Sequence, residues 1–285
     1  MADQHTPRSL IVSLYGVYGR DPGGEPLPVA ELIRLLAALG VDAPSVRSSV
    51  SRLKRRGLLV AGRTADGAAG YALSDEARQL LDDGDRRIYP DDRRAAGEGW
   101  VLAVFSVPEA ERHKRHLLRS RLGRLGFGTA APGVWIAPAA LYEETRHTLR
   151  RLRLDPYVDL FRGEHLGFAA TAEAVGRWWD LDAIAALYED FLERHEPVLR
   201  AWTARTGGAA GPGPGGDEDA YRDHLLALDS WRRLPYADPG LPAALLPADW
   251  PGGRAARVFA GLHTLLREPA ARFAGLGQAT TGTRS

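Results

Sequence analysis

The first 73 residues carry an ordered series of apolar patterns, and this series constrains the fold more than any other feature of the sequence. Three segments place apolar residues at intervals of three and four, which indicates helices that each bury one face. Two short apolar runs then flank Asp66-Gly67, a dipeptide typical of hairpin turns. Three helices followed by a hairpin predict a winged helix-turn-helix. The predicted helices are 9–18, 29–39 and 44–56, and the hairpin strands are 58–63 and 70–73.

The third predicted helix and the strand after it carry a local positive charge. Residues 43–65 hold six Lys or Arg and no acid, although the whole chain, with 37 basic and 36 acidic residues, has a net charge of +1. Helical geometry places Ser48, Ser51 and Arg55 opposite the apolar side. Hydroxyls between guanidinium groups suit a DNA major groove, whereas a solvated basic face is the alternative. The candidate DNA-binding residues are Ser45, Arg47, Ser48, Ser51, Arg52, Lys54, Arg55 and Arg63.

The pattern changes after a polar segment at 86–99, which we interpret as a linker. Residues 100–163 predict strands and helices in the order β-α-β-β-α-β, which is a ferredoxin-like unit. From about residue 170 the pattern is helical, and 207–216 contains six Gly and two Pro, which predicts a flexible loop. We therefore predict an α+β multidomain chain. Its domains are a winged helix at 1–88, a ferredoxin-like middle domain at 95–170 and a helical C-terminal domain at 171–285.

Composition and motifs exclude several kinds of chemistry. The chain has no Cys, which excludes disulfides and thiolate nucleophiles, and it lacks the G-x-S-x-G, P-loop and H-E-x-x-H patterns. His113 and His116 lie three residues apart, but the surrounding cations disfavour a metal dication. We expect no catalytic residue, no metal and no cofactor. No apolar run approaches the ~20 residues that span a bilayer, so we expect a cytoplasmic protein without a membrane partner.

Five local patterns resemble, in the same order, the PaaX family of bacterial transcriptional regulators. They are SLIVSLYGVYGR (9–20), VRSSVSRLKRRGLL (46–59), GFGTAAPGVWIAP (126–138), WWDLDAIAALYEDF (178–191) and DPGLPAALLPADWPG (238–252). The resemblance implies a winged-helix domain, a ferredoxin-like middle domain and a helical C-terminal domain. It also implies a homodimer that represses catabolic or biosynthetic genes. By the same resemblance, the effector that releases the DNA is an aryl-CoA thioester such as phenylacetyl-CoA.

A second basic segment has several interpretations. Residues 111–124 hold six Lys or Arg against the single acid Glu111. This helix is a solvated face, a second DNA contact or a docking surface for the phosphates of an effector. If the effector is an acyl-CoA, aromatic side chains of the C-terminal region are candidates for its ring, although they fit a core equally well. The candidate effector-binding residues are Arg112, Arg115, Arg119, Trp178, Tyr188, Tyr221 and Trp231.

We therefore expect a dimeric, ligand-responsive repressor on a double-stranded operator. Two-fold symmetry predicts an inverted repeat with half-sites about one helical turn, or a multiple of it, apart. The alternatives are a nucleic-acid hydrolase built on the middle domain and a DNA-binding scaffold without an effector. The middle domain also resembles a CRISPR-associated ferredoxin-like nuclease family, whose active members place an Asp at the end of the first strand. Here the predicted strand, 100–108, ends Phe105-Ser106-Val107-Pro108 with no carboxylate until Glu109, which argues against nuclease chemistry.

Overall fold

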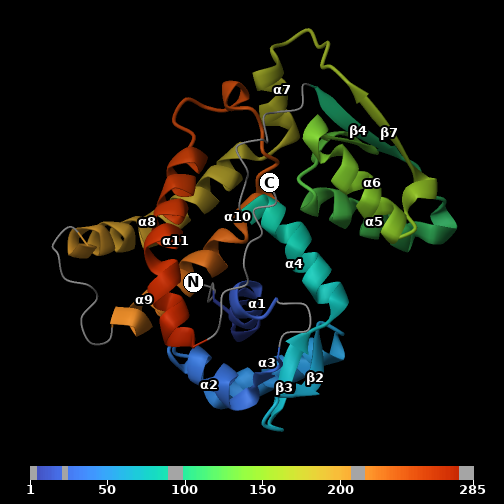
Figure 1. Ribbon diagram of the computed structural model, residues 1–285. Coiled ribbons are helices and arrows are strands. Elements are labelled where there is room, and N and C mark those ends of the chain that lie inside the picture. The colour runs from blue at the N-terminus through green and yellow to red at the C-terminus, as the bar shows by residue number, and fades with distance from the viewer. Residues whose placement is uncertain (1–4, 21–24, 89–98, 207–215, 276–285) are drawn as a thin grey trace, which may run out of the picture. The chain divides into compact units, whose positions relative to one another are not determined.

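The protein is a mixed α+β chain with two antiparallel sheets (Figure 1). Contacts divide it into two compact units, of which the first combines three separate stretches of sequence. The predicted domain boundaries stay a prediction, because a unit defined by contacts need not coincide with a domain that folds alone. The computed structural model describes residues 5–20, 25–88, 99–206 and 216–275. Unit 1 comprises Met1–Arg86, Phe191–Arg232 and Arg254–Ser285, and unit 2 comprises Arg87–Asp190 and Arg233–Gly253.

The N-terminal part of unit 1 has three helices, a small sheet and a fourth helix. Thr6 caps the first helix and Asp42 caps the third, each through its side chain, and Pro follows both caps within the first turn. Gly57 ends the third helix region with a φ of +71°, a left-handed conformation that favours glycine. The elements are α1 (Pro7–Tyr18), β1 (Leu27–Pro28), α2 (Val29–Ala37), α3 (Ala43–Arg55), β2 (Leu59–Arg63), β3 (Ala69–Leu73) and α4 (Asp75–Ile88).

The sheet has the order β1-β3-β2, so the predicted hairpin gains a third strand. Leu27 pairs with Tyr71 and Pro28 with Gly70. A strand of two residues that includes a proline carries no alternating pattern, which is why the sequence did not predict it. The backbone approaches closely here, since a Cβ on Gly70 would lie 2.7 Å from the Leu27 carbonyl oxygen.

Unit 1 is completed by helices from the C-terminal third of the chain. Phe191 lies edge-on to Trp231, which in turn stacks on Phe259 with ring centroids 4.9 Å apart, and these aromatic rings form its core. The predicted helix at about 254–267 continues to Ala274 through Pro269. The helices are α8 (Leu181–Thr206), which begins in unit 2, α9 (Gly216–Trp231) and α11 (Gly252–Ala274). Residues 207–215 of the predicted loop and 89–98 of the predicted linker lie outside the described residues, whereas Gly216 begins α9 and 86–88 end α4.

Unit 2 contains the β-α-β-β-α-β order in a four-stranded sheet with the order β5-β6-β4-β7. Every strand pair is antiparallel. Leu118, Leu122 and Leu149 from the two helices pack against Val101 and Ala103 of the central strand. The elements are β4 (Trp100–Phe105), α5 (Arg112–Arg124), β5 (Gly128–Ala131), β6 (Val134–Pro138), α6 (Tyr142–Arg151) and β7 (Val158–Gly163), followed by α7 (Thr171–Trp178) and α10 (Leu234–Ala237).

The helical pattern after residue 170 is interrupted at Trp179, which ends α7 in an extended conformation. Its indole Nε1 donates to the Gly126 carbonyl oxygen at 2.9 Å, and Asp180 then accepts from the backbone N–H of Ala183 to begin α8. A residue larger than glycine does not fit at position 128, because a Cβ there would lie 2.7 Å from the Trp179 ring. Among the described residues, no helix has the length and apolar character needed to cross a membrane.

Candidate nucleic-acid interface

Helix α3 has one buried side and one solvent side. Val46, Val50 and Leu53 are buried, together with the small Ser49. The N-terminus of the helix is fixed by Asp42, whose carboxylate accepts from the backbone N–H and the hydroxyl of Ser45, each at 2.8 Å. These hydrogen bonds lower the pKa of Asp42. Ser45 therefore acts as part of the cap, and the solvent side of α3 begins beyond it.

The solvent side of α3 exposes the predicted serines and cations. Ser48, Ser51, Arg47, Lys54 and Arg55 are all exposed, as is Arg52. The guanidinium of Arg52 donates to the Ser48 hydroxyl at 2.9 Å, one helical turn away. Within the described part of the chain, no carboxylate forms an ion pair with these cations. The surface consequently presents unneutralised guanidinium and ammonium groups to an external anion. We call this surface, residues 47, 48, 51, 52, 54 and 55, the α3 face.

The β2–β3 hairpin adds one cation next to the turn. Arg63 lies at the end of β2, and its guanidinium donates to the Gly67 carbonyl oxygen at 2.8 Å. Gly67 has a φ of +85°, which the Asp66-Gly67 turn requires. Asp66 accepts hydrogen bonds from the Thr64 side chain and the Ala68 backbone, and these lower its pKa. The turn is thus held by its own side chains, which fixes Arg63 at the tip of the hairpin.

The two helices that contact α3, α1 and α2, are each hydrogen-bonded to another part of unit 1. The hydroxyl of Tyr15 in α1 donates to the Tyr71 carbonyl oxygen in β3 at 2.8 Å, and burial raises the pKa of Tyr15. Arg34 in α2 donates to the carbonyl oxygens of Phe273 and Ala274 at 3.3 and 3.2 Å. These carbonyls end α11 and have no partner within the helix. Helix α1 is therefore hydrogen-bonded to the hairpin, and α2 is hydrogen-bonded to the end of α11.

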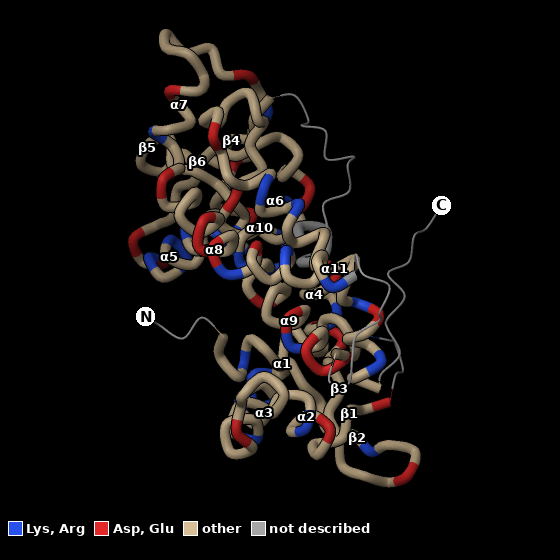
Figure 2. Tube along the Cα trace, turned by 90° about the vertical axis from the view of Figure 1, so that its left-hand side faces the viewer, with Lys and Arg blue, Asp and Glu red and all other residues tan. Residues whose placement is uncertain are grey.

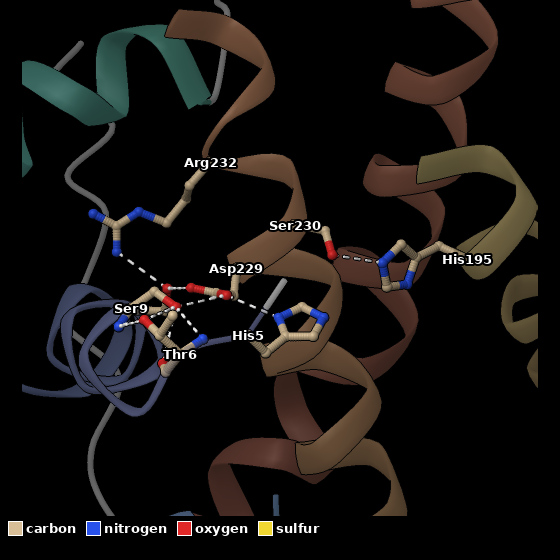
Figure 3. Close-up of polar contacts among 8 residues, drawn as sticks. His5, Thr6, Ser9, His195, Asp229, Ser230 and Arg232 are labelled. Atoms are coloured by element: carbon tan, nitrogen blue, oxygen red, sulfur yellow. Dashed lines mark hydrogen bonds and ion pairs between the residues drawn. The ribbon is translucent and has the colours of Figure 1, made fainter. Parts of the chain in front are cut away.

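A buried carboxylate joins α1 to α9 (Figure 3). Asp229 is 3% exposed and accepts from the hydroxyls of Ser13 at 2.9 Å and Ser9 at 3.1 Å, and from His5 Nδ1 at 2.8 Å. Arg232, directly after the end of α9, donates to the same Ser13 hydroxyl at 3.4 Å. The charge of Asp229 is thus compensated by donors from one short segment. Sequence analysis missed this contact, because nothing in the spacing of Ser9, Ser13 and Asp229 relates positions more than 200 residues apart.

The candidate effector-binding arginines lie on α5. Arg115 donates to the Val107 carbonyl oxygen at 2.8 Å and pairs with Glu109, so its guanidinium is already engaged. Arg112 and Arg119 are exposed. Lys114 of the same helix donates to Glu111 at 2.6 Å, and Tyr157 donates to that carboxylate at 2.7 Å.

The four candidate aromatic residues divide between the two units. Trp178 and Tyr188 belong to unit 2, and Tyr221 and Trp231 belong to unit 1. Trp178 is half-buried and lies edge-on to Trp100, whereas the Tyr188 hydroxyl donates to Asp238 at 2.7 Å. Tyr221 and Trp231 are 0% and 4% exposed, which places both in the core. Their role in binding an effector stays a prediction.

Three family models, all of PaaX-like proteins, match successive parts of the chain. The family model of a PaaX-like protein matches residues 6–77, that of the PaaX central Cas2-like domain matches 93–175, and that of the PaaX-like C-terminal domain matches 179–275. The transcriptional repressor PaaX of Escherichia coli K12 is 27% identical over 268 residues, which cover 93% of this chain and 82% of the relative.

A solved structure supports the fold. An uncharacterized protein from Mycobacterium tuberculosis aligns with a TM-score of 0.62 over 95% of this chain and 99% of that one, at 24% identity. At this identity the likeness concerns the fold alone. The three family models, in contrast, follow one another in the order of a single family and leave only short segments unmatched. The chain therefore belongs to the PaaX family, as the five sequence patterns predicted.

Proposed function

We propose that this protein is a transcriptional repressor that binds duplex DNA through a winged helix-turn-helix within residues 1–88. In this proposal α3 enters the major groove and the β2–β3 hairpin is the wing. The observation that carries it is the α3 face, an exposed set of cations and hydroxyls without a carboxylate partner among the described residues. The name of the Escherichia coli relative, a transcriptional repressor, supports the same function.

Each part of the α3 face has a role that its chemistry suits. Arg47 and Arg52 can each form two parallel hydrogen bonds with the O6 and N7 atoms of guanine. Ser48 and Ser51 are short enough to approach base edges or phosphates, and Lys54 and Arg55 suit the phosphate backbone. Arg63 at the hairpin tip suits a second backbone contact. Ser45 donates both its backbone N–H and its hydroxyl to the capping residue Asp42, so its part in the interface would be limited to its hydroxyl oxygen as an acceptor.

The operator and the effector belong to the same proposal. A homodimer with two-fold symmetry would bind an inverted repeat whose half-sites lie about one helical turn, or a multiple of it, apart. An aryl-CoA thioester such as phenylacetyl-CoA would release the DNA by favouring a form of the dimer that does not fit this spacing. A hundredfold loss of DNA affinity corresponds to a coupling free energy of roughly 2.7 kcal/mol. The sequence suggested Arg112, Arg115 and Arg119 as effector contacts. A contact with DNA is the other use that the sequence left open for this basic helix, and the two uses predict different outcomes in the experiments below.

The proposal includes no enzymatic step. A nuclease on the ferredoxin-like unit would need a metal-binding carboxylate at the end of β4, and β4 ends at Phe105 without one. The next acids along the chain, Glu109 and Glu111, pair with Arg115 and Lys114. These carboxylates are therefore occupied by neighbouring cations, which supports a binding function over hydrolysis.

The test is a titration of DNA from the gene's own upstream region with the full-length protein, at fixed salt, with and without phenylacetyl-CoA. We expect binding that is at least a hundredfold tighter than to a shuffled duplex of the same length, and release by the thioester. Equal binding to both duplexes would contradict the proposed function. Selective binding that the thioester leaves unchanged would keep the repressor and reject this effector.

A further inference from the structure

Helices α5 and α6 form one continuous outer surface of unit 2. Both pack on the same side of the sheet, because Leu118 and Leu122 of α5 and Leu149 of α6 share one core with Val101 and Ala103. Their other sides face solvent. Two segments separated by about 20 residues in the sequence therefore contribute to one surface, which we call the α5/α6 face.

The α5/α6 face has a large excess of positive charge. Residues 109–155 contain ten Lys or Arg against five Asp or Glu, a net charge of +5, whereas the whole chain carries +1. Four of the acids lie just before α5 or in the first turn of α6, the fifth is Asp155 beyond α6, and three of the five form ion pairs with neighbouring cations. These pairs are Glu109 with Arg115, Glu111 with Lys114 and Glu143 with Arg146. The acids of this segment are therefore too few to balance its ten cations.

Four arginines of this face are exposed and unengaged. Arg112 and Arg119 project from α5, and Arg150 and Arg151 from α6. Within the described part of the chain, no side-chain hydrogen bond or ion pair involves any of them. Figure 2 shows Lys and Arg on both helices. Arginines spread over two helices match a long, repeating anion, whereas a small anion needs donors that converge on one point.

We propose that the α5/α6 face binds the phosphate backbone of duplex DNA without regard to sequence. The inference rests on the proposed function, since it adds a second DNA contact to that of α3. Duplex DNA presents one negative charge per ~1.7 Å of its axis, and each neutralised phosphate releases counterions. Such a surface raises affinity for every duplex equally. It therefore adds to the salt dependence of binding and not to the choice of operator.

The test uses the full-length protein and a random-sequence duplex, with no CoA compound present. Arg119→Ala combined with Arg150→Ala should lower the slope of log affinity against log salt by about 2, that is about 0.9 per lost contact. The same relation predicts an affinity lower by one to two orders of magnitude at 0.1 M salt. The preference for the upstream region over random duplex should stay within about twofold of the wild type.

The matched control is Arg200→Ala with Arg257→Ala, which removes two exposed arginines from α8 and α11 in unit 1. It loses the same net charge and should keep the wild-type slope. Equal slopes for both double variants would overturn the proposal. A separate titration of the upstream duplex, with and without phenylacetyl-CoA, gives a second outcome against the proposal. If Arg119→Ala with Arg150→Ala binds random duplex normally but is no longer released from the upstream duplex by the thioester, the face binds an effector and not DNA.

Failure of the proposed function is visible separately in these experiments. A wild type that shows no preference for its upstream region would contradict the repressor, while the random-duplex slopes still decide the role of the α5/α6 face. Far-UV circular dichroism and thermal unfolding of both variants confirm that they are folded. Exposed substitutions of this kind change stability little, so both variants should unfold at nearly the wild-type temperature.

Discussion

Unit 1 uses polar side chains in two opposite ways. On the α3 face, cations are exposed and have no carboxylate partner among the described residues. At the contact between α1 and α9, the charge of Asp229 is buried and accepts from Ser9, Ser13 and His5. The first arrangement leaves hydrogen-bonding capacity for another molecule, and the second uses it within the chain. The comparison indicates that loss of a side chain should affect binding in one region and folding in the other.

The largest effect should come from Asp229→Ala. This change leaves the buried Ser13 and the half-buried Ser9 and His5 without their acceptor, at a cost of about 3 kcal/mol, most of it from the buried Ser13. Asp229→Asn keeps the volume and one acceptor oxygen, so it should lose less. Urea unfolding followed by circular dichroism measures both. An alanine variant as stable as the wild type would show that the buried contact contributes nothing to folding.

On the α3 face we expect the loss of a side chain to weaken DNA binding and to leave stability nearly unchanged. Arg47→Ala or Arg52→Ala should weaken operator binding by roughly 1–3 kcal/mol if each contacts a base through two hydrogen bonds. The free energy of unfolding should stay within about 0.5 kcal/mol of the wild type, because both side chains are exposed. A gel-shift titration at fixed salt measures the affinity. Unchanged affinity would remove these two residues from the interface.

The third prediction concerns pH and a buried histidine of α9. Burial, and then the neighbouring His263, lower the pKa of His224 to about 3, from an ordinary value near 6.5. Below pH 6.5 the unfolded chain therefore binds a proton that the folded chain does not, and stability falls as the pH decreases. Each pH unit corresponds to about 1.4 kcal/mol, so the loss should reach about 2 kcal/mol by pH 5.

The histidine variant separates this effect from general acid denaturation. His224→Gln cannot take up the proton, so its stability should decrease less between pH 6.5 and pH 5 than that of the wild type. The lowered pKa of His263, which burial also causes, gives a remaining dependence of the same sign. Urea unfolding at several pH values provides the measurement. Identical pH profiles for variant and wild type would exclude His224 as the source.

The smallest effect should follow from Tyr15→Phe. The change removes only the hydroxyl that donates to the Tyr71 carbonyl oxygen, a bond that links α1 to the hairpin. We expect a loss of stability of about 1 kcal/mol, the usual net value of one hydrogen bond. Operator affinity should change less than for Arg52→Ala. A larger effect on DNA binding than on unfolding would mean that this bond positions the wing.

The two regions also differ in how far the sequence predicts them. The exposure of Ser48, Ser51 and Arg55 follows from the periodicity of α3, since the apolar positions fix which side is buried. The caps Thr6 and Asp42 and the turn at Gly67 are local in the same way. These features depend on residues within a few positions of one another, which a single sequence displays directly.

The Asp229 contact and the hydrogen bonds from Arg34 to the end of α11 could not be predicted from the sequence. Each joins residues more than 200 positions apart, and the partners are common residue types without a distinctive spacing. The strand β1 was missed because two residues show no period, and the end of α11 because Pro269 reads as a helix stop. Tertiary contacts decide these cases, and one sequence does not say which helix faces meet.

The buried Asp229 contact can form only after most of the chain has been synthesised. Ser13 and Asp229 are 216 residues apart. A ribosome that adds about 5–20 residues per second takes roughly 10–40 s to make that stretch. During this interval α1 has emerged while its partner helix α9 does not yet exist, and Ser9 and Ser13 are exposed to water. The contact of α1 with α9 is therefore completed only near the end of translation, and a chaperone that shields α1 would act during the interval before that.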